Sequence, residues 1–311
     1  MWLNVTIVAL SLIAFLGGLR VMRQGLEGMG KGRLHMVLQQ FVSTPTRGIF
    51  TGTIVTALLQ SSAAVTAISV GFVASGTMAF RDAVGVVLGS NVGSTITPQL
   101  LTLDLRMIAL PCLLVGIILF ASRKPHLFYP SMALTGFATI FLALQVMPTG
   151  LRPLAQTPAF RSVLQSAGAH PLMAVLGGML TSAMLQSSTA TTVFTMALVS
   201  QSAIPLSGGI SIVLGANIGT CLTSVIAAIG QSRAAQRVAL AHVLLNVGGV
   251  ALTLPFLTGY SHWMVMLSPN PAQQIANAHT IFNVSCTLLV WPFTRQFSTL
   301  VERLLPGEFQ A

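Results

Sequence analysis

Two short polar motifs stand inside apolar sequence, and each of them occurs twice. The first is Gln60-Ser61-Ser62, which recurs as Gln186-Ser187-Ser188-Thr189. The second is Gly-Ser-Asn-Val-Gly-Ser-Thr at 89–95, which recurs as Gly-Ala-Asn-Ile-Gly-Thr at 215–220. Burying amides and hydroxyls in an apolar environment costs free energy unless they find partners. The motifs therefore predict a binding site made of carboxamides, hydroxyls and backbone groups.

These motifs belong to a longer internal repeat. A shift of 126 residues aligns 52–97 with 178–223 without a gap, so both motifs fall on their counterparts in register. Further upstream, Phe15-Leu16 falls on Phe141-Leu142. Two polar motifs at identical spacing in two places indicate that one unit has been duplicated.

The chemistry of this site follows from the residue types that are present and absent. The acidic residues, Glu27, Asp82, Asp104, Glu302 and Glu308, all fall at loops or helix ends. With neither carboxylate nor Lys or Arg expected at mid-membrane, an ion site has to use neutral oxygens and amides. A helix that starts after each Gln-Ser-Ser would point its free N–H groups at an anion. Glycines around each Asn permit local unwinding, and freed carbonyls with hydroxyls can hold a hard cation such as sodium.

The elements that position these motifs are apolar segments of membrane-spanning type. Of the 311 residues, 53% are hydrophobic and 6% charged, whereas soluble domains carry roughly 25% charged residues. A bilayer-spanning helix needs about 20 mostly apolar residues. The composition predicts an all-α polytopic membrane protein. Its expected apolar segments are 3–21, 48–76, 83–103, 107–122, 127–147, 171–200, 205–229, 234–257 and 274–294.

The segments that hold Gln-Ser-Ser have an unusual length. Gly48 to Gln60 makes about 18–20 Å of helix, which is too short for a hydrocarbon core of about 30 Å. A re-entrant helical hairpin, at about 47–76 and again at about 171–200, fits better. The alternative is one long tilted helix with polar residues at its middle.

Two hairpins leave about seven crossings, and this number predicts two inverted-topology repeats. Residues 1–126 form the first repeat, with three crossings, so the second repeat (127–311) enters upside down and adds a C-terminal helix at 274–296. In each repeat we expect the helix with the second motif to be broken. Twelve of the fifteen Lys and Arg residues then fall on one side, and Arg106, Arg152 and Arg161 on the other. This puts the N-terminus outside and the C-terminus in the cytoplasm; counting the hairpins as full crossings gives the same ratio.

Two further helical segments carry paired polar residues. His242 with Asn246, and His279 with Asn283, stand at i, i+4 on one helix face. Hydrogen bonding to a neighbouring helix is the favoured interpretation, and a direct ligand or proton role is the alternative. For all the small polar residues a third possibility is helix packing without ligand binding.

The duplicated Gln-Ser-Ser followed by Gly-x-Asn-x-Gly-Ser/Thr resembles the type II sodium-dependent phosphate cotransporter family, and in particular its short bacterial members without a C-terminal regulatory domain. The resemblance implies sodium-coupled import of inorganic phosphate by alternating access, with substrate and sodium near the bilayer midplane. The implied substrate residues are Gln60, Ser61, Ser62, Asn91, Gln186, Ser187, Ser188, Thr189 and Asn217. The implied sodium residues are Gln60, Ser94, Thr95, Thr97, Gln186, Thr220 and Thr223.

The expected protein is thus a symporter of the cell inner membrane, with no enzymatic activity and no organic cofactor. Its partners would be phosphate, sodium and membrane lipids, with no nucleic acid, and a homodimer is compatible with the sequence. The alternatives are a carrier of another small oxyanion or a dicarboxylate, or a channel or accessory membrane protein.

Overall fold

The computed structural model describes residues 1–30, 33–103, 106–158 and 170–307. Within these ranges the regular structure is helical, which confirms the predicted all-α class. Lys31, Asp104, Arg161 and Glu308 lie outside the described residues. The α-helices are α1 (Trp2–Met29), α2 (Arg33–Phe41), α3 (Pro45–Leu59), α4 (Ser62–Ala74), α5 (Phe80–Gly93), α6 (Ile96–Leu101), α7 (Arg106–Ala121), α8 (Pro125–Ala155), α10 (Pro171–Leu185), α11 (Ser188–Ser200), α12 (Leu206–Ala228), α13 (Arg233–Thr253), α14 (Leu257–Leu267), α15 (Pro271–Val290) and α16 (Thr294–Leu304); short 3₁₀ turns lie at Leu254–Phe256 and Trp291–Phe293.

The surface of the helical bundle is apolar in the manner of a membrane protein. Many large apolar side chains are exposed, among them Met107 at 92% and Met184 at 84%. So much exposed apolar surface is unfavourable in water. Four helical stretches of the described chain are long and apolar enough to cross a membrane: Trp2–Met29, Pro125–Ala155, Leu206–Ala228 and Arg233–Leu267. The other predicted crossings, 83–103, 107–122 and 274–294, fall in helices that do not meet both conditions.

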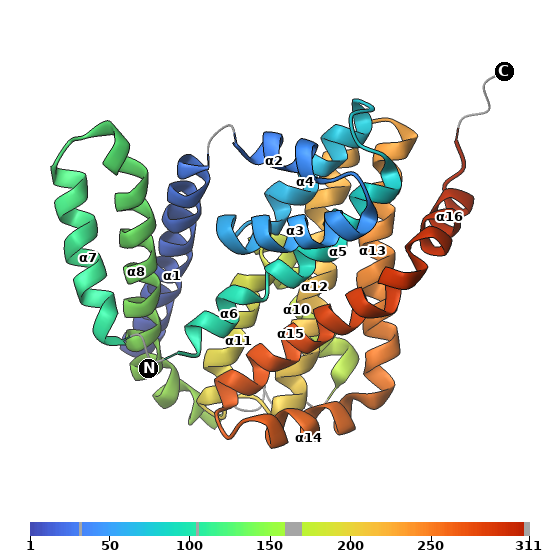
Figure 1. Ribbon diagram of the computed structural model, residues 1–311. Coiled ribbons are helices and arrows are strands. Elements are labelled where there is room, and N and C mark those ends of the chain that lie inside the picture. Colours follow the sequence, from blue (N-terminus) through green and yellow to red (C-terminus); the bar gives the residue numbers. More distant parts are fainter. Residues whose placement is uncertain (31–32, 104–105, 159–169, 308–311) are drawn as a thin grey trace.

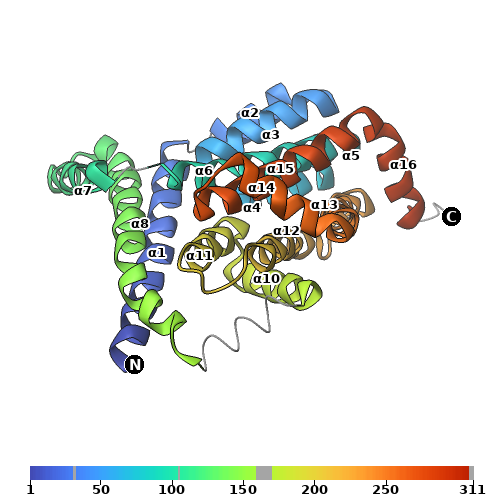
Figure 2. The ribbon, with the colours of Figure 1, turned by 90° about the horizontal axis from the view of Figure 1, so that it is seen from below.

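Helices α1, α7 and α8 form a panel at one side of the molecule (Figures 1 and 2). The contacts between α1 and α8 are the most extensive of any pair of elements, and α7 packs on α8. Gly25 lies so close to Ala133 and Tyr129 of α8 that a side chain there would overlap their backbone. Contacts from this panel to the remaining helices are sparse, chiefly α1 with α3 and α8 with α11.

Both long helices of the panel exceed the ranges expected from the sequence. The first helix was predicted at 3–21 but runs to Met29, a length of 28 residues or about 42 Å. The fifth segment was predicted to end at 147, yet α8 continues to Ala155 through Pro148 and Pro153. Proline usually disrupts a helix interior, but here Gly150 and the buried Leu151 extend α8, and Gly150 packs against Asn4 and Ile7 of α1. Packing of α1 and α8 along each other thus overrides two local signals for a helix end, the end of the apolar run after residue 21 and the prolines of α8.

In the rest of the molecule, two helix pairs pack in the same way at positions 126 residues apart. Helix α3 packs along α5, and α10 packs along α12. At Gly52 a Cβ would collide with the carbonyl oxygen of Val86, and at Gly178 with that of Ile212. The glycines of the second motifs behave alike, since Gly89 abuts Ile49 and Gly215 abuts Val175. The motif glycines therefore serve close helix packing.

The expectation that both second-motif helices are broken is correct for the first copy and wrong for the second. Helix α5 ends at Gly93, a turn at Ser94 and Thr95 follows, and α6 begins at Ile96. Helix α12 instead runs without interruption through 206–228. The reason is Pro98, which has no N–H to give to the carbonyl of Ser94 four residues earlier, whereas the matching position in α12 is Ser224.

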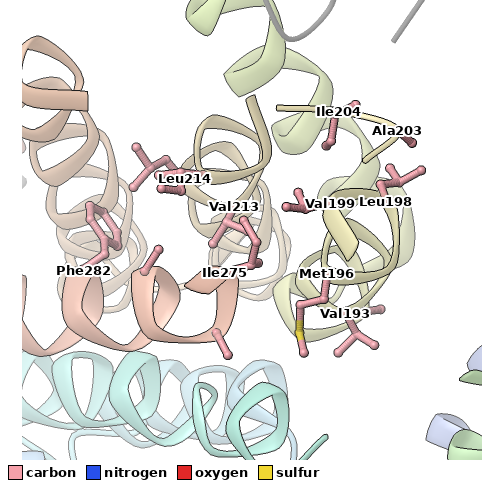
Figure 3. Packing of buried hydrophobic residues seen from close by; sticks show 14 of the residues in the cluster. Val193, Met196, Leu198, Val199, Ala203, Ile204, Val213, Leu214, Ile275 and Phe282 are labelled. Carbon is pink, nitrogen blue, oxygen red and sulfur yellow. The ribbon is translucent and has the colours of Figure 1, made fainter. Parts of the chain in front are cut away.

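Buried apolar side chains gather in two clusters. One joins α2, α3, α4 and α5 to α13 and α16, and contains Val65, Val86 and Val87. The other joins α10, α11, α12, α14 and α15 to the panel, and Figure 3 shows side chains of α11, α12 and α15 meeting within it. The first Gln-Ser-Ser lies at the edge of one cluster and the second at the edge of the other. The structure thus holds each motif on a separate packed support.

Candidate functional site

Each Gln-Ser-Ser forms the sharp turn between two helices. Gln60 ends α3 in the left-handed conformation with φ 59° and ψ 26°, and Gln186 ends α10 with φ 50° and ψ 35°. Such φ values are uncommon for residues other than glycine. At each turn the chain leaves along a new direction, and α3 and α4 pack mainly on other helices rather than on each other. The same strained residue at both places shows that the two turns have one local geometry.

The serine after each glutamine caps the following helix. The Ser61 hydroxyl accepts a hydrogen bond from the N–H of Ala64 at 3.3 Å, and the Ser187 hydroxyl accepts one from Ala190 at 3.2 Å. The capping serine satisfies one of the four N–H groups that a helix start leaves without an intrahelical partner. The earlier N–H groups of α4 and α11 remain as donors at the tips, with the positive ends of both helix dipoles.

The two tips share the wall of one small cavity. It measures about 10 Å³, close to the minimum that holds one ordered water molecule. The wall joins both motifs to the α5–α6 turn and to one residue of α1. The lining residues are Arg23, Gln60, Ser61, Ser62, Ala63, Ser94, Gln186, Ser187, Ser188 and Thr189. Seven of the sequence-predicted substrate residues are therefore brought together from segments more than a hundred residues apart.

Ser94 links the broken helix to the second tip. Its carbonyl oxygen accepts a hydrogen bond from the Thr189 hydroxyl at 3.3 Å, in place of the backbone donor that Pro98 lacks. The Ser94 hydroxyl bonds to the carbonyl of Asn91 at 2.7 Å. The break in the helix thus places a carbonyl and a hydroxyl beside the cavity.

Arg23 is a member of the site that the sequence analysis missed. The first apolar segment was expected to end at 21, before Arg23, and no Lys or Arg was expected among the groups of the ion site; the structure corrects both points. Because α1 continues to Met29, Arg23 lies one turn after the buried Leu19 on the same helix face. Its Nη2 donates to the Ser187 hydroxyl at 2.9 Å. The i, i+4 spacing from Phe15 to Leu19 to Arg23 was the available signal.

Asn91 and Asn217 do not line the cavity and instead bond to the paired His and Asn residues. Asn91 lies 3.2 Å from Nε2 of His242, and its amide donates weakly to Asn246 at 3.5 Å. Asn217 accepts from Asn283 at 3.1 Å and donates to the Val213 carbonyl at 2.8 Å. These contacts attach α13 to α5 and α15 to α12, as the favoured interpretation expected for His242, Asn246 and Asn283. The His279 ring does not follow it, since neither of its nitrogens has a hydrogen-bond partner among the described residues.

The remaining predicted sodium residues also lie off the cavity wall. The hydroxyls of Thr95, Thr220 and Thr223 each donate to a carbonyl three residues earlier in their own helical turn. The buried Thr97 hydroxyl has no hydrogen-bond partner within the described part of the chain. Only Gln60, Ser94 and Gln186 of that predicted set reach the cavity.

Comparison with known proteins gives one family. The model of the family described as Na+/Pi-cotransporter matches residues 14–149 and, a second time, 145–276. The chain is 34% identical over 261 residues to the uncharacterized protein YqeW of Bacillus subtilis, a match that covers 84% of this chain and 85% of that protein.

Two further relatives have names that state a transported ion. The chain is 30% identical over 261 residues to the Escherichia coli protein named "Putative inorganic phosphate export protein YjbB". That match covers 83% of this chain but only 48% of the relative, so the chain spans about half of its length. A match of 37% identity over 62 residues joins 20% of the chain to 10% of the rat sodium-dependent phosphate transport protein 2A. No solved structure matches the chain.

Proposed function

The chain belongs to the Na+/Pi-cotransporter family, and on this premise we propose that it carries inorganic phosphate across a membrane by coupling its movement to sodium. The observation that carries the proposal is the cavity at which both Gln-Ser-Ser tips meet. Two helix N-termini that converge on one point make an anion site from backbone donors. The serine and threonine hydroxyls around them add donors that suit the oxygens of a tetrahedral oxyanion.

The phosphate ligands in this proposal are the groups at the cavity wall. They are the free N–H groups at the start of α4 and α11 and the side chains of Ser61, Ser62, Ser187, Ser188 and Thr189. Asn91 and Asn217 would act behind this wall, because their hydrogen bonds hold α5 and α12 against α13 and α15. Their amides would then position the tips and leave phosphate contact to the serines.

Sodium would bind where the helix is interrupted. A hard cation prefers oxygen ligands, and Ser94, with its carbonyl and hydroxyl, lines the same cavity as Gln60 and Gln186. We place no ligand on α12, since Thr220 and Thr223 bond to their own helix. Binding of the cation next to the anion would lower the cost of holding phosphate in a low dielectric.

The topology that goes with this function is the one expected from the sequence. Residues 1–126 and 127–311 would form two inverted repeats, each with a re-entrant helix pair, in the inner membrane with the N-terminus outside. Support comes from the two consecutive matches to one family model and from the equal glycine packing of α3 on α5 and α10 on α12. Inverted repeats with a site at their interface are a common plan of alternating-access carriers.

Cysteine labelling tests the re-entrant pairs. In a background without Cys112, Cys221 and Cys286, single cysteines replace Ser43 and Ser75, which are exposed at the outer ends of α3 and α4. A membrane-impermeant maleimide added to oriented vesicles should label both from the same side. Labelling from opposite sides would show that the segment spans the bilayer.

The direction of transport that we propose is import, because cells maintain a sodium gradient directed inward. The name of the Escherichia coli relative describes export by that protein, which makes phosphate efflux the second candidate. Proteoliposomes with the sodium gradient imposed in either direction compare the two. Accumulation of phosphate only on the low-sodium side supports coupled import, and net efflux that ignores the gradient supports export.

Uptake by the purified protein in liposomes tests the function as a whole. Labelled phosphate should accumulate saturably with external sodium and fail to accumulate when choline replaces sodium. Equal accumulation in the two salts would refute coupling. Saturable sodium-driven uptake of sulfate or a dicarboxylate without phosphate would refute the substrate.

A further inference from the structure

One positive side chain reaches a cavity that is otherwise lined by neutral groups. Arg23 joins the wall from α1, while every other lining residue is a Gln, Ser, Thr or Ala. Its Nη2 bonds to Ser187, and its buried Nε has no hydrogen-bond partner among the described residues. Glu27, one turn later on α1, interacts with Arg23 through its charge, but it is exposed and does not line the cavity. The site therefore contains a guanidinium with donor capacity to spare.

We propose, on the basis of the proposed function, that Arg23 binds the transported phosphate directly and makes the cavity selective for anions. In the described conformation the guanidinium donates a hydrogen bond to the Ser187 hydroxyl. On substrate entry, Arg23 exchanges this hydroxyl for a phosphate oxygen, and Ser187 keeps its bond to the N–H of Ala190. Arginine suits this task because its planar guanidinium presents five donors and stays charged at every physiological pH.

The size of the cavity supports an exchange of partners. A volume of about 10 Å³ accommodates about one water molecule, so a tetrahedral oxyanion enters only after a lining side chain moves. Arg23 is the longest side chain in the wall and has the most rotatable bonds. The backbone of the tips is fixed by the left-handed glutamines and by the caps, and Arg23 is thus the wall member with the most freedom to make room.

Arg23 also comes from the panel, whereas the tips lie between α3 and α4 and between α10 and α11. It sits on α1, which packs on α8 and touches the other helices sparsely. A phosphate held by Arg23 on one side and by the tips on the other would connect the panel to the rest of the molecule.

The experiment measures phosphate uptake at fixed sodium by liposomes that contain the full chain with Arg23→Gln, Arg23→Lys or Arg20→Gln. Gln at 23 keeps a donor for Ser187 but removes the charge, and Lys keeps the charge without the planar donor pair. Arg20→Gln is the matched control, because Arg20 lies three residues earlier on α1 and is exposed. Hydrogen bonds to charged groups are among the stronger polar contacts, so Arg23→Gln should raise the KM for phosphate about tenfold or more. Arg23→Lys should raise it less, and Arg20→Gln should leave it unchanged.

Two further readouts separate a ligand from a structural residue. A ligand predicts that Arg23→Gln changes the KM for phosphate while the apparent KM for sodium and the thermal stability in detergent stay near those of the unsubstituted protein. An unchanged phosphate KM in Arg23→Gln would overturn the proposal, as would an equal rise in Arg20→Gln. If the unsubstituted protein moves no phosphate, the proposed function itself fails, and the inference falls with it. If the unsubstituted protein takes up phosphate and Arg23→Gln has the same KM for phosphate, only the role of Arg23 is refuted.

Discussion

The two copies of the second motif have nearly the same residues and different backbones. In the first copy the helix stops at Ser94, whose carbonyl turns to Thr189. In the second copy Thr220 takes the equivalent place inside an unbroken α12. The difference follows from one residue four positions later, Pro98 against Ser224, because proline cannot donate the i to i−4 hydrogen bond. A duplicated unit can thus place a carbonyl beside the cavity in one half and form an unbroken supporting helix in the other.

The first-motif copies differ by burial instead of by backbone. Both glutamines are left-handed and both serines cap a helix. Ser187, however, is 5% exposed and bonded to Arg23, whereas Ser61 is half-buried. The same local turn therefore has a charged partner on one side only. This asymmetry means that the two tips should contribute unequally to substrate affinity.

The largest expected effect comes from imposing the break of the first copy on the second. Ser224→Pro removes the N–H that closes the helix at Thr220 and costs about 3 kcal/mol or more. It also removes the 2.7 Å hydrogen bond between the Ser224 hydroxyl and Nδ1 of His242. We expect loss of the monodisperse protein in fluorescence-detected size-exclusion chromatography.

Ser224→Ala is the control for this substitution, since it removes only the hydrogen bond. It should lower stability by about 1 kcal/mol and leave the protein monodisperse. A well-folded Ser224→Pro would show that α12 tolerates the break and that its continuity has another cause.

The next effect compares the two capping serines. Ser187→Ala removes a cap and the Arg23 partner, whereas Ser61→Ala removes a cap, and each cap contributes about 1 kcal/mol. Because hydrogen bonds to charged groups contribute about 1.5–3 kcal/mol, Ser187→Ala should lower the melting temperature of the substrate-free protein more than Ser61→Ala does. An equal drop in melting temperature in the two variants would contradict the asymmetry between the tips.

At their closely packed glycines, the two copies should respond alike to substitution. Gly178→Ala drives a methyl group into the Ile212 carbonyl, and Gly52→Ala does the same at Val86. Overpacking of this kind costs about 1–3 kcal/mol, so both variants should lose thermal stability to a similar extent. Gly177 has no atom within 4 Å of the position of its Cβ, and Gly177→Ala should be neutral or slightly stabilising. A clear loss in one copy alone would contradict equivalent packing.

The smallest effect concerns the two buried histidines. His242 bonds to Ser224 and Asn91, whereas neither ring nitrogen of the fully buried His279 has a partner within the described chain. Replacing a partnered group leaves the partners unsatisfied, which costs about 1–3 kcal/mol. His242→Leu should therefore lower the melting temperature more than His279→Leu does. If His279→Leu is the more harmful, its imidazole has a polar task that the packing does not reveal.

Much of the local structure can be derived from the sequence. Composition predicts the helical membrane class, the 126-residue shift reveals the pairing of motifs, and Gln-Ser-Ser marks both turns. The helix break could also have been assigned to one copy, since Pro98 is visible in the sequence and has no counterpart at Ser224. Asn91 and Asn217 could not be placed, because a buried amide serves equally well as a ligand or as a partner of another helix.

The sequence by itself determined where the chain turns and caps, because these depend on residues within four positions: a proline without a donor, or a serine before a helix. It also determined that two identical tips exist. Only the tertiary structure decided that the tips share a cavity and that Arg23 lies in it. The hydrogen bond from Arg23 to Ser187 joins residues 164 positions apart, and no local rule specifies which helix face will meet a given tip. Helix α1 extends past its apolar segment because it packs on α8. This extension places the charged Arg23 at a cavity whose other lining residues are neutral.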